Sequence, residues 1–434
     1  MSEPLVLRLP VELFMKIFTF IPRTYLFDLS TVCHTFHDLA APLIFATFRF
    51  HPGVYGETSA SGTCLRRELD RLSFWSSDAI APLVRKCFIW LYCTSITTDS
   101  IESSTLGTAA FEAVSRFKHL RTLSCNFGNH KVEFTGLRVE GLADLQSIKI
   151  NAGILAPPHD PGEPRLEIRH FAYTEIPFLP LSRPPCISLL DPTRLHSLEL
   201  SYFHPHGLEH FLGDASTIAP FHNLRTLHIS FRDTDLTHIH AAISPFPSVC
   251  ELTVHIHGSC SAEVVPTTPL APHLESYKGP AVLLPLVMAD SAPDKLVITK
   301  GSTTQVLEAL RAAMHPEFVT SLSMGVKLNT DIRQGDVLQD IFRLCPNLSR
   351  TSLEVSSDDL PVVTDGGFNT ITLSQKLVEI FLPLKELETL VLQWRLGSVI
   401  GIVPRKSELE ILLRSRLPAL QYVFFVDTFG LLRY

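Results

Sequence analysis

Hydrophobic residues near the start of the chain recur with helical spacing. Four of them stand at positions i, i+4, i+7 and i+8, namely Leu13, Ile17, Phe20 and Ile21. This spacing places them on one stripe of an α-helix. Pro10 stands where the first turn of a helix tolerates proline, and Pro22 disfavours helical geometry at the residue before it. The pattern therefore predicts a first helix that begins near Pro10 and ends near Ile21.

A second series of apolar residues follows Pro22 with the same spacing of three or four residues. Its members are Leu26, Leu29, Val32, Phe36, Leu39 and Leu43. The series predicts a short helix followed by a longer one. Three such short helices can bury only a small core. Part of this apolar surface is therefore expected to need a partner.

The same segment carries the pattern of a known family. The matching residues are Leu9-Pro10, Glu12-Leu13, Ile17-Phe18, Pro22, Leu26, Leu29, Val32-Cys33 and Phe36. In this register the segment resembles the F-box, a helical module that docks on a Skp-type adaptor in cullin-RING ubiquitin ligases. The family usually has Trp where this chain has Phe36, so an aromatic ring is kept and an indole donor is lost. The resemblance implies adaptor contacts by Leu9, Pro10, Leu13, Ile17, Leu26, Val32, Cys33 and Phe36. An ordinary helical cap on the next domain is the alternative.

A different apolar pattern begins near residue 84 and recurs toward the C-terminus. Each copy has an apolar residue, two other residues, a second apolar residue, one other residue and a third apolar residue. The clearer copies begin at Val84, Leu120, Leu145, Ile168, Leu195, Leu224, Val249, Val319, Leu387 and Leu420. Weaker copies begin at Leu274, Pro293 and Leu348. From Leu120 to Leu274 the successive steps are 25, 23, 27, 29, 25 and 25 residues, which indicates a repeat architecture.

Each copy predicts a bend and then a short strand whose alternate side chains point inward. Helical patterns lie between copies, at residues 106–117, 235–243, 303–314, 337–344 and 407–413. One strand and one helix per unit, stacked in line, predict an α/β solenoid. The pattern resembles leucine-rich repeats over roughly residues 80 to 430, although the family's usual Asn or Cys position is not kept and one unit reaches 39 residues, from Leu348 to Leu387. A generic α/β domain with buried strands is the alternative.

These patterns predict the organisation of the whole chain. Residues 1–50 form the helical module, residues 51–80 a linker or first cap, and residues 81–434 the solenoid. The expected fold class is α/β, a three-helix F-box followed by an irregular leucine-rich-repeat-like solenoid. Three insertions rich in proline, glycine or acidic residues predict loops, at residues 156–164, 176–186 and 358–370.

The predicted outward positions of several strands are polar. They are Ser147, Lys149 and Asn151; Ser197, Glu199 and Ser201; Thr226, His228, Ser230 and Arg232; and Glu251, Thr253, His255 and His257. Because neighbouring strands lie about 4.8 Å apart, His228, Arg232, His255 and His257 are expected to form one patch that suits an acidic or phosphorylated segment. With Lys149 and Glu199, these residues are the candidate substrate-binding set. A solvated face without a partner is the alternative.

Three His-x-His pairs raise the possibility of a metal site. They are His204/His206, His238/His240 and His255/His257. Two side chains at i and i+2 of a strand share a face, but a zinc site needs three or four ligands. The cysteines do not cluster with any pair, so no metal is expected.

Composition narrows the function further. The chain has 434 residues and a net charge of −7, which argues against a broad electrostatic grip on nucleic acid or on an acidic membrane. Its nine cysteines are scattered and form no C-x-x-C pair, which favours buried thiols in a reducing compartment. The N-terminal stretch lacks the apolar run of a secretory signal, and the longest apolar segment, residues 281–289, contains Pro285. We therefore expect a cytoplasmic or nuclear protein without a membrane partner.

The sequence contains no enzyme signature: the P-loop, the dinucleotide fingerprint, H-E-x-x-H and G-x-S-x-G are all missing. We expect no catalytic residue and no cofactor. Cys33 is expected mid-helix in a packing role. The F-box resemblance implies a non-catalytic substrate-recognition subunit of a Skp-cullin-F-box ubiquitin ligase, whose partners are the Skp-type adaptor, the cullin and RING subunits reached through it, and a target protein.

Two alternatives to this function remain open. One is an F-box scaffold that does not direct ubiquitin transfer. The other is a repeat protein that binds nucleic acid or another ligand and carries an unrelated helical cap. The combination of an F-box with degenerate repeats resembles the expanded F-box family of fungi, especially basidiomycetes.

Overall fold

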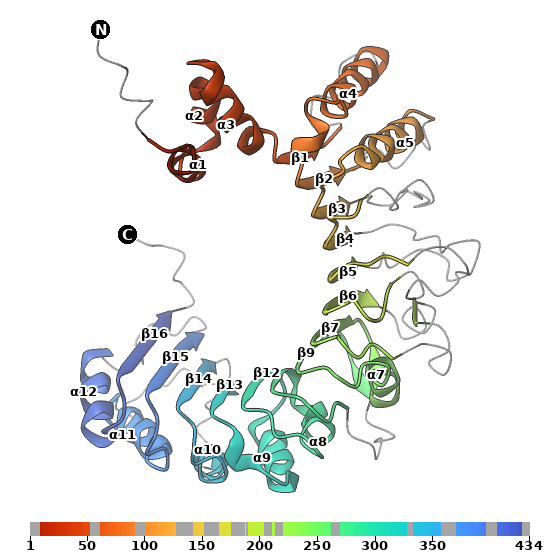
Figure 1. The fold of residues 1–434 in the computed structure, drawn as a ribbon. Helices are drawn as coiled ribbons and strands as arrows, with labels where there is room; N and C mark the ends of the chain where they lie inside the picture. The colour runs from red at the N-terminus through yellow and green to blue at the C-terminus, as the bar shows by residue number, and fades with distance from the viewer. Residues whose placement is uncertain are drawn as a thin grey trace. The chain divides into compact units, whose positions relative to one another are not determined.

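The computed structural model describes most of the chain in two compact units, residues 1–214 and residues 215–434. The described residues are 9–52, 61–91, 101–126, 142–151, 165–174, 187, 190–203, 211–212, 220–261, 270–327, 333–356, 370–395 and 406–427. Figure 1 shows the elements of both units along the chain. Each unit is described by itself below.

Unit 1 begins with a module of three helices. They are α1 (Val11–Thr19), α2 (Arg23–Ser30) and α3 (His34–Ile44). Pro10 and Pro22 are the N-caps of α1 and α2, with φ of −57° and −56°, so each proline ends the preceding segment and starts a helix without losing a helical donor. The three helices confirm the predicted helical head, and the first one ends at Thr19, close to the predicted end at Ile21.

A parallel sheet follows in the same unit. Its strands, in order, are β1 (Thr47–Phe50), β2 (Lys86–Trp90), β3 (Thr122–Asn126), β4 (Ser147–Asn151), β5 (His170–Thr174) and β6 (Ser197–Phe203). Two helices, α4 (Ser61–Trp75) and α5 (Ile101–Ser115), and a short 3-10 turn at Ala81–Leu83 lie between strands. Because β1 pairs with β2, the sheet begins at β1. The predicted solenoid began later in the chain, at residue 81.

Unit 2 continues the same alternation of parallel strands and helices. Its sheet runs β7 (Thr226–Phe231), β9 (Glu251–Ile256), β11 (Ser276–Pro280), β12 (Lys295–Lys300), β13 (Ser321–Lys327), β14 (Arg350–Ser356), β15 (Thr389–Arg395) and β16 (Tyr422–Asp427). A two-stranded pair joins β8 (Thr234–Asp235) to β10 (Cys260–Ser261). The helices are α7 (Leu236–Ile243), α8 (Leu284–Val287), α9 (Thr303–Ala312), α10 (Arg333–Leu344), α11 (Thr370–Phe381) and α12 (Lys406–Arg416), with 3-10 turns at Ala281–Leu283 and Pro316–Phe318. In Figure 1, α9 to α12 lie along one side of the strands.

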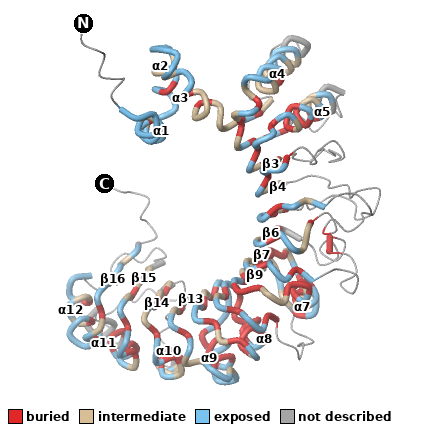
Figure 2. Tube along the Cα trace, in the orientation of Figure 1, coloured by how far each residue is buried: buried red, intermediate tan, exposed pale blue. Residues whose placement is uncertain are grey.

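The repeated apolar positions form the core between strands and helices. In the copies that begin at Val84, Leu120 and Leu224, all three apolar residues are buried. The weaker copies are strands as well, because Leu296 and Leu353 are buried in β12 and β14. Figure 2 shows this buried seam along the strands of both units. The predicted α/β solenoid class is confirmed.

The strand of the last predicted copy, β16, is less buried than the others because it lies at an edge of the sheet. Among the described residues, β16 pairs only with β15. Its Val423 and Phe425 are half-buried, whereas the equivalent Leu390 and Leu392 of β15 are fully buried. A strand with one neighbour leaves part of its inward side chains uncovered.

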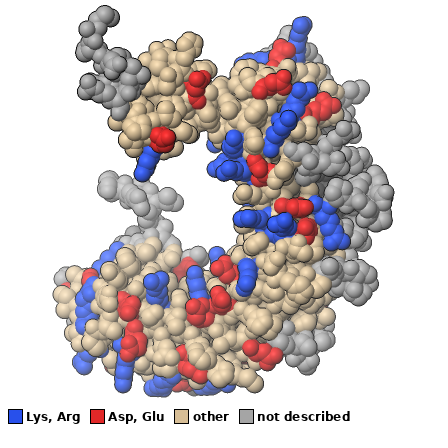
Figure 3. Space-filling model, in the orientation of Figure 1, with Lys and Arg blue, Asp and Glu red and all other residues tan. Residues whose placement is uncertain are grey.

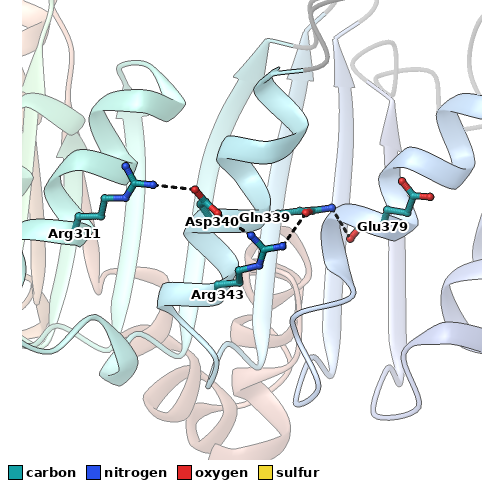
Figure 4. Close-up of polar contacts among 5 residues, drawn as sticks. All are labelled: Arg311, Gln339, Asp340, Arg343 and Glu379. Atoms are coloured by element: carbon teal, nitrogen blue, oxygen red, sulfur yellow. Dashed lines mark hydrogen bonds and ion pairs between the residues drawn. The ribbon is translucent and has the colours of Figure 1, made fainter.

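Neighbouring helices of unit 2 are joined by polar contacts at their surface (Figure 4). Asp340 on α10 accepts hydrogen bonds from Arg311 on α9 and from Arg343 on its own helix, each at 2.9 Å. Gln339 donates to the backbone oxygen of Glu379 on α11 at 3.2 Å. One helix thus contacts both of its neighbours through exposed or half-exposed side chains.

Several sequence predictions differ from the structure in detail. The helix α11 was not predicted, α4 lies in the predicted linker or first cap at residues 51–80, and α5 begins before the helix predicted at residues 106–117. The predicted loops at residues 156–164 and 176–186 lie outside the described residues, and so does the predicted loop at residues 358–370 except for Thr370, which is the first residue of α11. The apolar segment that begins at residue 281 is part of the core, with Leu283, Leu284 and Val287 fully buried. In the part of the chain that the structure describes, no helix has the length and apolar character to cross a bilayer.

Candidate functional site

The helical module exposes one apolar stripe and buries another. Phe14, Phe18 and Ile21 of the α1 segment face Leu26, Ala40 and Ile44 in the module's core. Leu13 and Ile17 stay 46% and 47% exposed, and Phe20 is 79% exposed. The last three stand at i, i+4 and i+7, so they share a face of α1. Figure 2 shows how much of α1 is exposed.

Three residues of the predicted stripe, Leu13, Ile17 and Phe20, are exposed, whereas the fourth, Ile21, packs against the module's core. Helix α1 is apolar around more than half of its circumference, so periodicity alone did not show which face is buried. Large apolar side chains that remain exposed in a cluster are typical of a surface that binds another protein. The stripe of Leu13, Ile17 and Phe20 is hereafter called the α1 stripe.

Other predicted adaptor-binding residues are exposed as well. Leu9, Pro10 and Val32 lie on the surface. Cys33 is also exposed, and it is the N-cap of α3 with extended backbone, φ −162° and ψ 166°. This corrects the expectation that Cys33 packs in mid-helix, because α2 ends at Ser30 and the chain turns before α3 begins.

Two residues of the predicted set have a structural role inside the module. Leu26 is only 3% exposed and belongs to the core. Phe36 is half-buried, and its ring lies 5.6 Å from that of Phe14 and 5.3 Å from that of Phe18, edge to face with the latter. These two side chains hold α2 and α3 against α1, and so they support the exposed stripe from beneath.

Few charges surround the α1 stripe. Among residues 9–45 the charged side chains are Glu12, Lys16, Arg23, Asp28 and Asp38. Figure 3 shows a largely uncharged surface over the described part of α1 to α3. Covering such a surface removes few charges from water, so the desolvation cost of binding is small. Tyr25 and Phe27 of α2, which the sequence set did not include, are exposed too.

The predicted histidine patch is assembled in unit 2. The rings of His228 on β7 and His255 on β9 lie 5.1 Å apart, and those of His255 and His257 lie 6.5 Å apart. Ser230 and His257 share a hydrogen bond of 2.9 Å between Oγ and Nε2. Arg232 follows β7 directly, and its backbone oxygen accepts from the amide of Gly258. The strand register therefore brings the three predicted histidines together, and Arg232 lies next to them in the chain, directly after β7.

The electrostatics of this patch limit what it attracts at neutral pH. Burial lowers the pKa of His255, and the positive charges of His228, Lys278 and His257 lower it further. A histidine whose pKa is depressed is uncharged near pH 7. At neutral pH the His255 ring therefore adds no positive charge for anion binding, whereas Arg232 and Lys278 keep theirs.

No group of three or more potential metal ligands occurs among the described residues. His238 and His240 lie on helix α7, where residues two apart point to different sides. His238 instead contacts Asp235, the N-cap of that helix, at 2.7 Å. The pair His204/His206 lies outside the described residues.

The remaining two candidates lie in unit 1. Lys149 on β4 and Glu199 on β6 occupy the same register row, with Ala172 of β5 between them. Two strand spacings amount to about 10 Å. Lys149 is exposed and Glu199 is half-buried, so both are accessible, but the structure does not bring them into direct contact.

Four cysteines are buried, namely Cys87, Cys125, Cys250 and Cys345. Burial raises the pKa of the Cys345 thiol to about 12 and that of Cys87 and Cys125 well above their ordinary value. A buried thiol that stays protonated is a poor nucleophile. These cysteines therefore have packing roles.

Comparisons with known proteins bear mainly on the helical module. The family model described as F-box-like matches residues 6–51. Comparison with curated protein sequences gives no match. Among solved structures, a crystal structure of a Bacteroides fragilis protein from a structural genomics consortium is similar at 12% identity and a TM-score of 0.28, over 84% of this chain and 72% of that one. Residues 6–51, which contain α1 to α3 and the exposed α1 stripe, thus form an F-box-like domain.

Proposed function

We propose that this protein is a substrate-recognition subunit of a Skp-cullin-F-box ubiquitin ligase. In this role the F-box-like domain binds a Skp-type adaptor, and cullin and RING subunits join through the adaptor. The observation that carries the proposal is the α1 stripe, which is apolar and exposed although the domain already has a closed core of its own. An apolar surface of this kind on an F-box-like domain suits an adaptor groove.

The α1 stripe can supply part of the free energy of a protein interface. Full burial of one Leu, Ile or Phe side chain contributes about 1.5–3 kcal/mol. Leu13 and Ile17 each have about half of their area left to bury, and Phe20 has most of it. Together they supply roughly 3–5 kcal/mol before the cost of association. Leu9, Pro10, Val32 and Cys33 lie exposed on the same domain and add further contact area.

The strand-and-helix part of the chain would recruit the target. The candidate residues are Lys149, Glu199, His228, Arg232, His255 and His257, all half-buried or exposed on strands or directly after them. Ubiquitin transfer would then depend on proximity, because a bound target lysine is held near a conjugating enzyme carried elsewhere in the assembly. The chain itself would contribute no catalytic group and no cofactor.

We place the protein in the cytoplasm or nucleus and in the expanded fungal F-box family on the sequence resemblance alone.

The main alternative is an F-box scaffold that binds the adaptor without directing ubiquitin transfer. Co-purification separates the two functions: a substrate receptor captures cullin together with the adaptor, whereas adaptor without cullin favours the scaffold. The other alternative, a ligand-binding repeat protein with an unrelated helical cap, predicts that the adaptor does not bind at all.

The double substitution Leu13→Asp with Ile17→Asp tests adaptor binding. Two carboxylates in an apolar interface cost several kcal/mol each when unpaired, so we expect adaptor capture in a pull-down to fall at least a hundredfold. Both positions are half exposed, so the domain should stay folded, which circular dichroism would check.

Helix α1 also offers a matched control. Val11 and Met15 are apolar, each 50% exposed, and lie on another face of the same helix. Val11→Asp with Met15→Asp should keep adaptor capture within a few-fold of the wild-type protein. If the two double variants behave alike, or if the first retains full capture, the α1 stripe is not the adaptor site.

A further inference from the structure

The outward face of β1 to β5 in unit 1 carries cations and no carboxylate. The outward positions are Thr47, Arg49, Lys86, Phe88, Trp90, Thr122, Ser124, Asn126, Ser147, Lys149, Asn151, His170, Ala172 and Thr174. All alternate with buried residues, as in Phe48, Cys87 and Ile150. The set contains three residues of fixed positive charge and one histidine, but neither Asp nor Glu. A strand face with a single sign of charge attracts the opposite sign.

A second row of cations lies at the start of the same strands. The residues that immediately precede β2, β3, β4 and β5 are Arg85, Arg121, Gln146 and Arg169. They are neighbours, because the amide of Arg121 donates to the oxygen of Arg85, that of Gln146 to Arg121, and that of Arg169 to Gln146, at 2.8–2.9 Å. The equivalent positions of unit 2 are mixed, since Arg225 precedes β7 whereas Glu275, Asp294 and Glu388 precede β11, β12 and β15. A basic residue at this position is therefore not a property of the repeat in general.

Most of these cations have no acidic partner within the described residues. Lys86, Lys149 and Arg169 are exposed and form no ion pair there. One carboxylate lies near the row: the pKa of Asp144 is lowered first by its hydrogen bond with His119 and then by the charges of Arg121 and Arg85. A single exposed carboxylate leaves the row with a net positive charge. Figure 3 shows Lys and Arg side chains at the edge of unit 1 formed by these strands.

Aromatic side chains stand among the cations. Trp90 is 40% exposed on β2, with the His51 ring edge-on at 5.3 Å. The Arg49 guanidinium lies over the ring of Phe88, 5.7 Å from its centroid. Such contacts hold Arg49 and Trp90 in place before any partner arrives. Tryptophan and arginine are the residues that most often dominate binding energy at protein interfaces.

We propose that this surface, the outward face of β1 to β5 with the row Arg85, Arg121 and Arg169, binds an extended protein segment rich in Asp and Glu. Five strands span about 19 Å, which equals about six residues of extended chain. The positive charges of this surface are fixed Lys and Arg charges, so the surface is effective at neutral pH. The Ser, Thr and Asn side chains between the cations supply hydrogen bonds to the segment's backbone. The inference rests on the proposed function only in taking such a segment to be part of the target.

Fluorescence anisotropy with the full-length protein tests this surface. The probe is a fluorescein-labelled octapeptide of alternating Glu and Ser, and its reference is the same peptide with Gln in place of Glu. We expect the Glu peptide to bind at least tenfold more tightly than the Gln peptide, with an affinity that falls as salt rises. Equal binding of the two peptides, no binding, or tighter binding of a single-stranded RNA octamer would overturn the proposal.

Charge reversal locates the binding site. Lys86→Glu with Lys149→Glu should weaken Glu-peptide binding at least tenfold, and Trp90→Ala should weaken it several-fold. The matched control is Lys295→Glu with Arg350→Glu, which changes two exposed cations at outward strand positions of unit 2 and should leave binding within twofold. Lys86→Gln with Lys149→Gln replaces the first variant if it does not fold. Equal effects of the test and control pairs would contradict the assignment. Adaptor capture is measured on the same proteins, so that failure of this inference and failure of the proposed function are seen separately.

Discussion

At the scale of single residues, burial and neighbouring charges decide what each candidate side chain can do. His255 and Lys149 were both predicted on polar strand faces, but their environments differ. His255 is half-buried among other basic groups, whereas Lys149 is exposed without an ion pair in the described structure. The period of two along a strand identifies the outward residues, but it contains no information on these environments. The sequence therefore predicted positions well and protonation states poorly.

The histidine patch makes stability depend on pH. The pKa of His255 in the folded protein is below its ordinary value of about 6.5, so the unfolded chain binds more protons than the folded one just below pH 6.5. Stability from this residue is present above pH 6.5 and is lost as the pH falls. We expect His255→Gln to reduce the drop in Tm between pH 7.5 and pH 5.5, as measured by thermal denaturation. His222→Gln, at an exposed position outside the patch, is the control. Identical pH profiles for wild-type protein and His255→Gln would show that the half-buried ring does not titrate as described.

At the scale of elements, sequence periodicity located almost every strand, including the weak copies. The copy that begins at Pro293 forms β12 because Leu296 and Ile298 still point inward. Helix orientation was harder to predict, as α1 shows with its two apolar faces. The cationic row was also missed, since Arg85, Arg121 and Arg169 are far apart in the chain. A signal for it existed, because each arginine occupies the same place in its repeat, directly before the strand.

Helix α10 shows which contacts hold an element in the fold. On its exposed side Asp340 pairs with Arg311 and Arg343 (Figure 4). On its buried side Phe342 stacks on Phe381 of α11, with ring centroids 5.5 Å apart. Exposed ion pairs contribute about 0–1 kcal/mol, while truncation of a buried Phe costs about 3–5 kcal/mol. The aromatic contact should therefore contribute more to the stability of the fold than the exposed ion pairs do.

Substitutions on the two faces of α10 test this ranking. We expect Asp340→Ala to lower the free energy of unfolding by less than about 1 kcal/mol. Phe342→Ala should lower it by about 3–5 kcal/mol. Urea denaturation of the full-length protein, followed by circular dichroism, measures both. A loss for Asp340→Ala that equals the loss for Phe342→Ala would mean that the polar contacts between helices matter more than their exposure indicates.

At the scale of the whole molecule, the two proposed surfaces use different elements. The α1 stripe belongs to the F-box-like domain, and the cationic surface belongs to β1 to β5 and the residues before these strands. The core residues beneath them also differ: Phe18 and Leu26 support the first, while Phe48 and Ile150 lie under the second. A substrate receptor needs this separation, because the adaptor and the target must be bound at the same time.

Independence of the two surfaces is therefore the prediction that joins the two proposals. Effects at sites without shared partners usually add to within about 0.5 kcal/mol, or about twofold in affinity. Leu13→Asp with Ile17→Asp should leave Glu-peptide binding unchanged to that extent, and Lys86→Glu with Lys149→Glu should leave adaptor capture unchanged. Native mass spectrometry of the wild-type protein should then detect adaptor and Glu peptide on one molecule. If each partner displaced the other, the adaptor would compete with the acidic segment for one surface, and a receptor that delivers such a segment to the ligase would be ruled out.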